Sequence, residues 1–176
     1  MAGVLPPIVK QVVVKADPAR AFRRFTREIQ SWWPLASHSV FGGEAESLVF
    51  EERVGGRILE RAPGGRECSW GTVLEYDPPR RVVFTWHPGR EAPTAQTVEL
   101  VFAPEGDRTR VTLTHSGWEH FGSGAKQAHG AYPLGWRYVL GRFADERSVT
   151  MWSLTTLTNL VVALVRRGKK KESSTP

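Results

Sequence analysis

The residues with the most chemical potential lie in one stretch of ten, Leu113 to Gly122, which reads LTHSGWEHFG. His115, Glu119 and His120 are spaced H-x-x-x-E-H, which matches neither the H-E-x-x-H nor the H-x-x-E-H pattern of zinc peptidases. Ser116 lacks the G-x-S-x-G surroundings of a hydrolase nucleophile. We therefore expect neither a metal site nor a catalytic serine here, and we assign no catalytic residue.

The direction in which the His115 side chain points is more informative than the types of the residues around it. It continues the alternation of Val111 and Leu113, so its imidazole is predicted to face the same covered side as these apolar residues. Two interpretations stay open: a core histidine satisfied by a nearby carbonyl, or a polar group that orients a ligand in an apolar pocket. His120 lies beyond the turn and is expected to be exposed.

The chain has seven tryptophans, an unusual number for 176 residues. Aromatic side chains fill cores, and they also line ligand pockets. Trp32 and Phe41 follow the first predicted helix and could shape the entrance of a cavity, either as a lid or as a hydrophobic plug. The candidates for the lining of the cavity are Trp70, Trp86, His115 and Trp136, with Tyr132 beside them.

Two glutamates on predicted strands have opposite orientations. Glu60 shares the inward side of Ile58, where an unpaired carboxylate would be costly. Glu99 lies between Val98 and Leu100 and is expected to face solvent. Glu60 and His115 are therefore the acid/base candidates if the protein is an enzyme.

The pattern of elements predicts the α+β class. A β-branched segment over 8–15 precedes a helix that begins with Asp17 as N-cap and Pro18 in its first turn. This helix is expected to continue to the Trp-Trp-Pro at 32–34. Six strand-like segments between about 45 and 116 alternate with Gly- and Pro-rich turns, which indicates an antiparallel meander. A last helix is predicted over about 125–146, with a kink or an irregular first turn at Pro133.

The order of these elements, the Trp-Trp after the first helix, the THSGW that ends the last strand and the GWRYVLGRF of the last helix together carry a resemblance. Residues 8–147 resemble the START-like superfamily (SRPBCC), in the branch of the homologues of the activator of the 90-kDa heat-shock-protein ATPase. The resemblance implies a helix-grip fold in the order β-α-β6-α, a curved antiparallel sheet wrapped around a long C-terminal helix. It also implies a deep cavity for hydrophobic small molecules. Members include lipid carriers, hormone receptors, aromatases and cyclases, so the fold leaves the function open.

Charge and composition limit the partners and cofactors that we expect. The net charge is +6, but residues 166–176 alone carry +4, so we do not expect nucleic acid as the partner. A single cysteine excludes an intramolecular disulfide, and the sequence contains no G-x-G-x-x-G or P-loop, so no cofactor is expected. The start of the chain resembles no secretory signal, which favours the cytoplasm.

The last part of the chain is divided into two segments. Residues 148–165 are uncharged and are predicted to be helical, either packed on the domain or a partner, lying on a membrane surface, or anchored in a membrane. Residues 166–176 form a basic tail that we expect to be disordered. Membrane association through 148–165 is thus the alternative to a cytoplasmic location.

Together these observations predict non-catalytic binding of a small hydrophobic ligand in an aromatic-lined cavity. One alternative is an enzyme of the cyclase, aromatase or hydrolase kind that uses the same cavity. The other is a protein-interaction module such as a co-chaperone. The co-chaperone members of the branch carry a separate domain with an Asn/Trp-rich motif, and nothing like it occurs in this sequence, so a chaperone partner is the weaker expectation.

Overall fold

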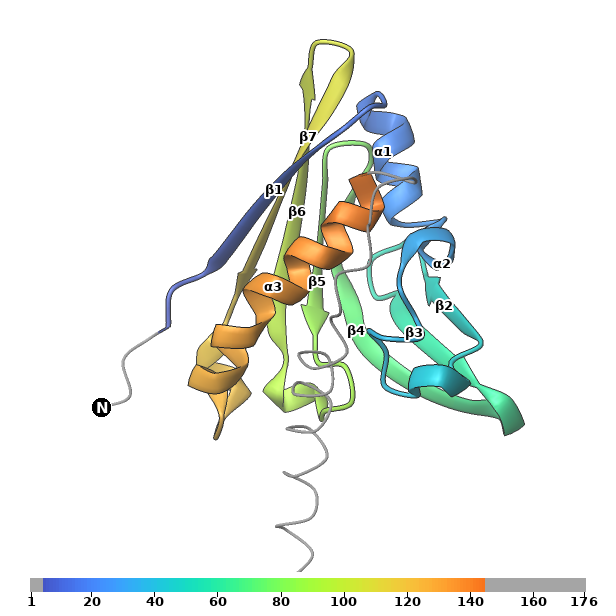
Figure 1. Ribbon diagram of the computed structural model, residues 1–176, viewed down its shortest axis with the longest axis vertical. Coiled ribbons are helices and arrows are strands. Elements are labelled where there is room, and N and C mark those ends of the chain that lie inside the picture. The colour runs from blue at the N-terminus through green and yellow to red at the C-terminus, as the bar shows by residue number, and fades with distance from the viewer. Residues whose placement is uncertain (1–4, 145–176) are drawn as a thin grey trace, which may run out of the picture.

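The computed structural model describes residues 5–144, and Figure 1 shows them as a curved antiparallel sheet with one long helix across its concave face. This arrangement confirms the predicted α+β, helix-grip class. The elements are β1 (Ile8–Val14), α1 (Pro18–Phe25), α2 (Ile29–Trp32), β2 (Ser47–Phe50), β3 (Arg57–Ala62), β4 (Arg66–Asp77), β5 (Arg81–Trp86), β6 (Gln96–Glu105), β7 (Arg108–Ser116) and α3 (Ala125–Ala144).

The seven strands lie in the order β1-β7-β6-β5-β4-β3-β2. The run from β2 to β7 is the predicted meander of hairpins, and β1 pairs with β7, so that the first and last strands are neighbours. In this pairing Ile8 lies opposite His115 and Val12 lies opposite Val111. The inward residues of β6 and β7 are fully buried, as their alternation predicted.

The first helix begins as predicted but ends earlier. The Asp17 carboxylate accepts a hydrogen bond from the Arg20 N–H at 2.8 Å, and Pro18 occupies the first turn. The helix stops at Phe25 because the backbone leaves the helical conformation at Thr26, with φ −88° and ψ −81°; the Thr26 hydroxyl donates to the Phe22 carbonyl at 3.0 Å. The chain then re-enters a helix as α2, so the expected single helix is two short ones.

Helix α3 buries Trp136, Val139, Leu140 and Phe143 against the sheet. It runs through Pro133 as one α-helix. Within residues 5–144, no helix combines the length and the apolar character that crossing a bilayer requires. The predicted segments 148–165 and 166–176 lie outside the described residues.

Strand β4 contains an extra residue where it pairs with β3. Ile58 lies opposite Gly71 and Leu59 lies opposite Ser69, so Trp70 has no partner in the ladder. This is a β-bulge, which bends the strand and re-aims its side chains. Gly71 is required beside it, because a Cβ at this position would lie 1.7 Å from the Thr85 carbonyl oxygen of β5.

Candidate functional site: an aromatic interior around His115

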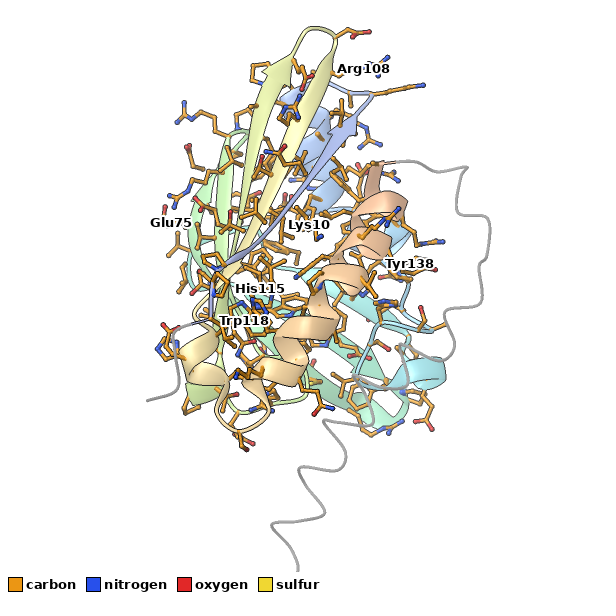
Figure 2. The ribbon with its side chains drawn as sticks, turned by 60° about the vertical axis from the view of Figure 1, so that its left-hand side comes forward. Lys10, Glu75, Arg108, His115, Trp118 and Tyr138 are labelled. Atoms are coloured by element: carbon orange, nitrogen blue, oxygen red, sulfur yellow. The ribbon has the colours of Figure 1, made fainter. Side chains whose placement is uncertain are left out.

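His115 lies at the end of β7, in the interior between the sheet and α3, where Figure 2 places it beside Trp118. Its side chain is fully buried, as the strand alternation predicted. The partner of the imidazole is an indole and not a carbonyl: Trp136 Nε1 donates to His115 Nδ1 at 3.0 Å. Burial, with a smaller effect of His129, lowers the pKa of His115 to about 3, so the ring is neutral near pH 7.

This hydrogen bond fixes where the imidazole proton lies. An indole N–H can only donate, so Nδ1 must present its lone pair. A neutral imidazole then carries its hydrogen on Nε2. Among residues 5–144, the buried Nε2 has no hydrogen-bond partner. Leaving a buried donor unpaired costs about 1–3 kcal/mol, so a buried polar atom without a partner calls for an explanation.

Aromatic rings surround His115 on several sides. The ring centroids of Trp118 and Tyr132 lie 4.3 Å and 4.8 Å from that of His115, and Trp118 Nε1 donates to the His115 carbonyl at 3.1 Å. Sequence reasoning did not place Trp118 at the site. Gly117 is the residue in the sequence that could have indicated its position. A glycine directly after a strand allows a sharp turn, and here its φ of +79° brings Trp118 back beneath the strand.

Four tryptophans continue the aromatic interior from His115 towards β3. Trp70 and Trp86 are 5.5 Å apart, and Trp86 and Trp136 are 5.4 Å apart, between ring centroids. Trp33 lies among them, with its centroid 5.3 Å, 5.9 Å and 6.3 Å from those of Trp70, Trp86 and Trp136. It is 7% exposed. Trp33 therefore belongs to the buried aromatic packing, although it comes from the connection after the first helices.

The four residues predicted to line a cavity, Trp70, Trp86, His115 and Trp136, thus lie close together. The two residues predicted at its entrance, Trp32 and Phe41, do not belong to this group. Trp32 packs one layer away, against Phe25 and Phe143. Phe41 lies outside the aromatic interior, and its ring carries the Arg66 guanidinium at 5.1 Å. A role of these two residues at an entrance stays a prediction.

Glu60 is fully buried and is not unpaired. Its carboxylate accepts hydrogen bonds from the backbone N–H groups of Val40 and Phe41, both at 2.9 Å, and from Trp70 Nε1 at 2.8 Å. Both oxygens are therefore occupied by fixed donors. This carboxylate holds the connection between α2 and β2 to the sheet, which makes it a structural anchor.

The same connection is also fastened to α3. Trp33 Nε1 donates to the His38 carbonyl at 2.7 Å, and the His38 ring stacks on Tyr138 of α3 with centroids 5.0 Å apart. Burial lowers the pKa of His38 to about 4, so this stack is uncharged near neutral pH. Trp33 is thus held in place from both sides of the interior.

Each of the six tryptophans among residues 5–144 donates its indole N–H. One of these bonds links β5 to α3: Trp86 Nε1 donates to the Tyr132 hydroxyl at 3.2 Å. Burial raises the pKa of Tyr132 to about 12, so this hydroxyl keeps its proton. The tryptophans therefore connect elements as well as filling space.

The part of α3 that faces His115 contains residues of low helix propensity. Gly130, Pro133 and Gly135 lie close to Tyr132 and Trp136 in the sequence. Proline supplies no N–H to the carbonyl four residues earlier, and glycine costs about 1 kcal/mol relative to alanine in a helix. The helix runs unbroken through these residues, so its packing on the sheet outweighs their low propensity.

A separate surface pocket of about 480 Å³ lies beside α1. Its lining comes from α1, from Arg27 and Glu52, and from the region of the β4–β5 turn, with Tyr76, Pro78 and Pro79. None of the predicted site residues lines it. Within residues 5–144, no three His, Cys, Asp or Glu side chains are grouped so that they could hold a metal ion.

Solved structures of several proteins share this fold. Protein MLL2253 from Mesorhizobium loti has a TM-score of 0.59 and 19% identity, over 81% of this chain and 99% of that one. The solution structure of the Aha1 dimer from Colwellia psychrerythraea has a TM-score of 0.57 and 19% identity, over 80% and 95%. At these identities the likeness shows the fold alone.

A third structure is more similar in sequence. The anthrahydroquino-γ-pyrone synthase Txn09 is 35% identical, with a TM-score of 0.58 over 82% of this chain and 98% of that one. Among curated proteins, none matches the chain. The model of the family described as Activator of Hsp90 ATPase homolog 1-like protein matches residues 15–147. This chain therefore belongs to the family of Activator of Hsp90 ATPase homolog 1-like proteins, within the START-like fold that its sheet and helix display.

Proposed function

We propose that this protein binds a small, planar, hydrophobic molecule in the interior between the sheet and α3. The observation that carries the proposal is the buried Nε2 of His115, a polar atom without a partner among closely packed aromatic rings. Binding sites for small molecules combine an apolar, aromatic lining with few polar groups that fix orientation. The interior around His115 has this composition.

Trp33 supports the same proposal. Its indole is a flat ring system set among Trp70, Trp86 and Trp136. It comes from a connection and not from a strand or helix, so its displacement breaks its hydrogen bond to the His38 carbonyl but no pairing between strands. A planar ligand that takes its place meets aromatic faces at the separations that stacking rings prefer, about 4.5–7 Å.

The test is a titration of the protein with fluorene, a planar tricyclic hydrocarbon, followed by quenching of tryptophan fluorescence. We expect saturable binding that Trp86→Ala weakens. The control is Leu74→Ala, because Leu74 is 45% exposed on β4 and should have no effect. Absence of saturable binding, together with an empty protein in native mass spectrometry after gentle purification from its host, would refute the proposal.

One observation favours a second function, catalysis on a molecule held in the same interior. Txn09, which is named an anthrahydroquino-γ-pyrone synthase, is 35% identical to this chain over 98% of its own length. The test is to offer this protein the molecule recovered from its host and to compare the mass and the ring structure before and after. An unchanged molecule that is released intact favours binding alone.

A further inference from the structure

The donors of the aromatic interior restrict the chemistry of its ligand. We propose that the ligand carries a carbonyl-type oxygen, which accepts hydrogen bonds from His115 Nε2 and from the Tyr132 hydroxyl. This inference rests on the proposed function and adds a ligand class to it: planar ring systems with an oxo group, such as quinones, pyrones and aromatic ketones.

The first donor follows from the hydrogen bond at the other side of the imidazole. Trp136 occupies His115 Nδ1 as a donor, so the neutral ring has its hydrogen on Nε2. Nε2 is buried and has no hydrogen-bond partner among residues 5–144. A ligand oxygen would supply the missing acceptor.

The second donor is the hydroxyl of Tyr132. Its oxygen accepts from Trp86 Nε1, so one lone pair is used and the hydrogen is still available. Among residues 5–144 the structure gives that hydrogen no acceptor. The Tyr132 and His115 rings are neighbours, with centroids 4.8 Å apart in an edge-to-face contact. In the proposed complex, one ligand oxygen lies between these two neighbouring groups.

The two donors also exclude other ligand chemistry. A ligand hydroxyl or amine that needs to donate finds no open acceptor on His115, because Trp136 has taken Nδ1. A carbonyl or a phenolate oxygen has no hydrogen of its own and fits two donors. In an interior of low dielectric constant these bonds are stronger than in water, and an unmatched donor costs more.

The same geometry gives His115 a role as a fixed donor. To act as a base it would have to take a proton on Nδ1, break the bond to Trp136 and become a buried cation. Its lowered pKa, about 3, reflects the cost of that charge. His115 is thus a positioning residue for the ligand oxygen, and the acid/base role that its residue type suggested is not available to it in this arrangement.

The experiment compares two probes of nearly equal shape, fluorene and 9-fluorenone, which differ by one carbonyl. For each protein variant we would measure both dissociation constants and take their ratio, which cancels changes in apolar packing. His115→Met removes the donor, and the preference for fluorenone should fall about two- to tenfold, because one hydrogen bond contributes about 0.5–1.5 kcal/mol. His115→Gln keeps an acceptor for Trp136 and a donor for the ligand, so it should retain most of the preference. Tyr132→Phe should reduce it by a smaller factor.

A second readout is the infrared carbonyl stretch of bound fluorenone. Two hydrogen bonds should move it to lower frequency in the wild type and in His115→Gln, and it should return towards the free value in His115→Met. Thermal unfolding of each variant without probe shows that it is folded.

The outcomes separate the two proposals. If fluorene and fluorenone both bind, but the ratio and the carbonyl stretch do not respond to His115, the inference is wrong and the binding function stands. The Nε2–H then rests against the neighbouring ring faces, as N–H groups do in weak contacts with aromatic systems. If neither probe binds to any variant and the protein is empty in native mass spectrometry, the binding function itself is refuted.

Discussion

Replacing Glu60 with glutamine tests how the connection that carries Trp33 is held. Both carboxylate oxygens of Glu60 accept from fixed donors: Oε2 from the Val40 N–H and from Trp70 Nε1, and Oε1 from the Phe41 N–H. The amide of Glu60→Gln has one oxygen and one NH₂ group. In its better orientation the oxygen keeps the two donors at Oε2, and the NH₂ group faces the Phe41 N–H.

The expected loss is one charge-assisted hydrogen bond, with one buried N–H left unpaired. Such a bond contributes about 1.5–3 kcal/mol. We therefore expect the free energy of unfolding to fall by about 2–3 kcal/mol and the melting temperature to fall by roughly 4–12 °C for a chain of this length. The assay is urea unfolding, with amide hydrogen exchange at Val40 and Phe41 as the local readout. Exchange should accelerate at Phe41 more than at Val40.

The matched control is Glu99→Gln. Glu99 faces away from the interior, and its carboxylate and its partner Arg81 are about one-third or more exposed to solvent. Removing an exposed charge of this kind changes stability by about 0.5 kcal/mol or less. If Glu60→Gln is as stable as the wild type and both amides stay protected, the carboxylate does not hold the connection and the reasoning is refuted.

Further predictions concern pH, the bulge and Trp33. The pKa of His115 is lowered in the folded state, so the unfolded chain binds more protons between about pH 6.5 and 3. The free energy of unfolding should therefore fall as the pH falls through this range, and it should fall less steeply in His115→Gln. Urea unfolding at several pH values measures both. Gly71→Ala should destabilise the protein by roughly 3 kcal/mol or more, because its Cβ would lie 1.7 Å from the Thr85 carbonyl oxygen. Gly43→Ala is the control: Gly43 has open space around it, so this change should leave the free energy of unfolding unaltered in the same assay. Trp33→Ala should lower the free energy of unfolding by about 3–5 kcal/mol. Added indole can fill the space left and should restore part of this stability, which thermal unfolding with and without indole measures. Wild-type protein should show no such rescue if Trp33 fills this space.

The sheet and the direction of His115 could be predicted from the sequence because they depend on local periodicity. Alternation along β6 and β7 has a period of two, and the Gly- and Pro-rich turns between strands leave few ways to connect them. Val98, Leu100 and Leu113 followed from this pattern, and so did His115. The family resemblance then supplied the helix-grip arrangement.

The rest of the site could not be predicted because it depends on contacts between distant segments. No local signal gives the bond from Trp136 to His115, which fixes the proton on Nε2. The position of Trp33 depends on the anchoring of its connection by Glu60, which lies far along the chain. The early end of α1 is a change of backbone conformation at Thr26, which a stripe of apolar residues does not reveal.

The bulge in β4 has an evolutionary consequence. The extra residue aims Trp70 at the interior, where it donates to Glu60 and contacts Trp33. A deletion of one residue there would restore regular pairing with β3, withdraw this ring and release one support of the connection above it. Insertion or deletion in β4 can therefore change the packing of the interior in one step, while the pairings of β5 with β6 and of β6 with β7 keep their register. Proteins of this fold can vary their interior through the length of one strand, before any substitution in the lining.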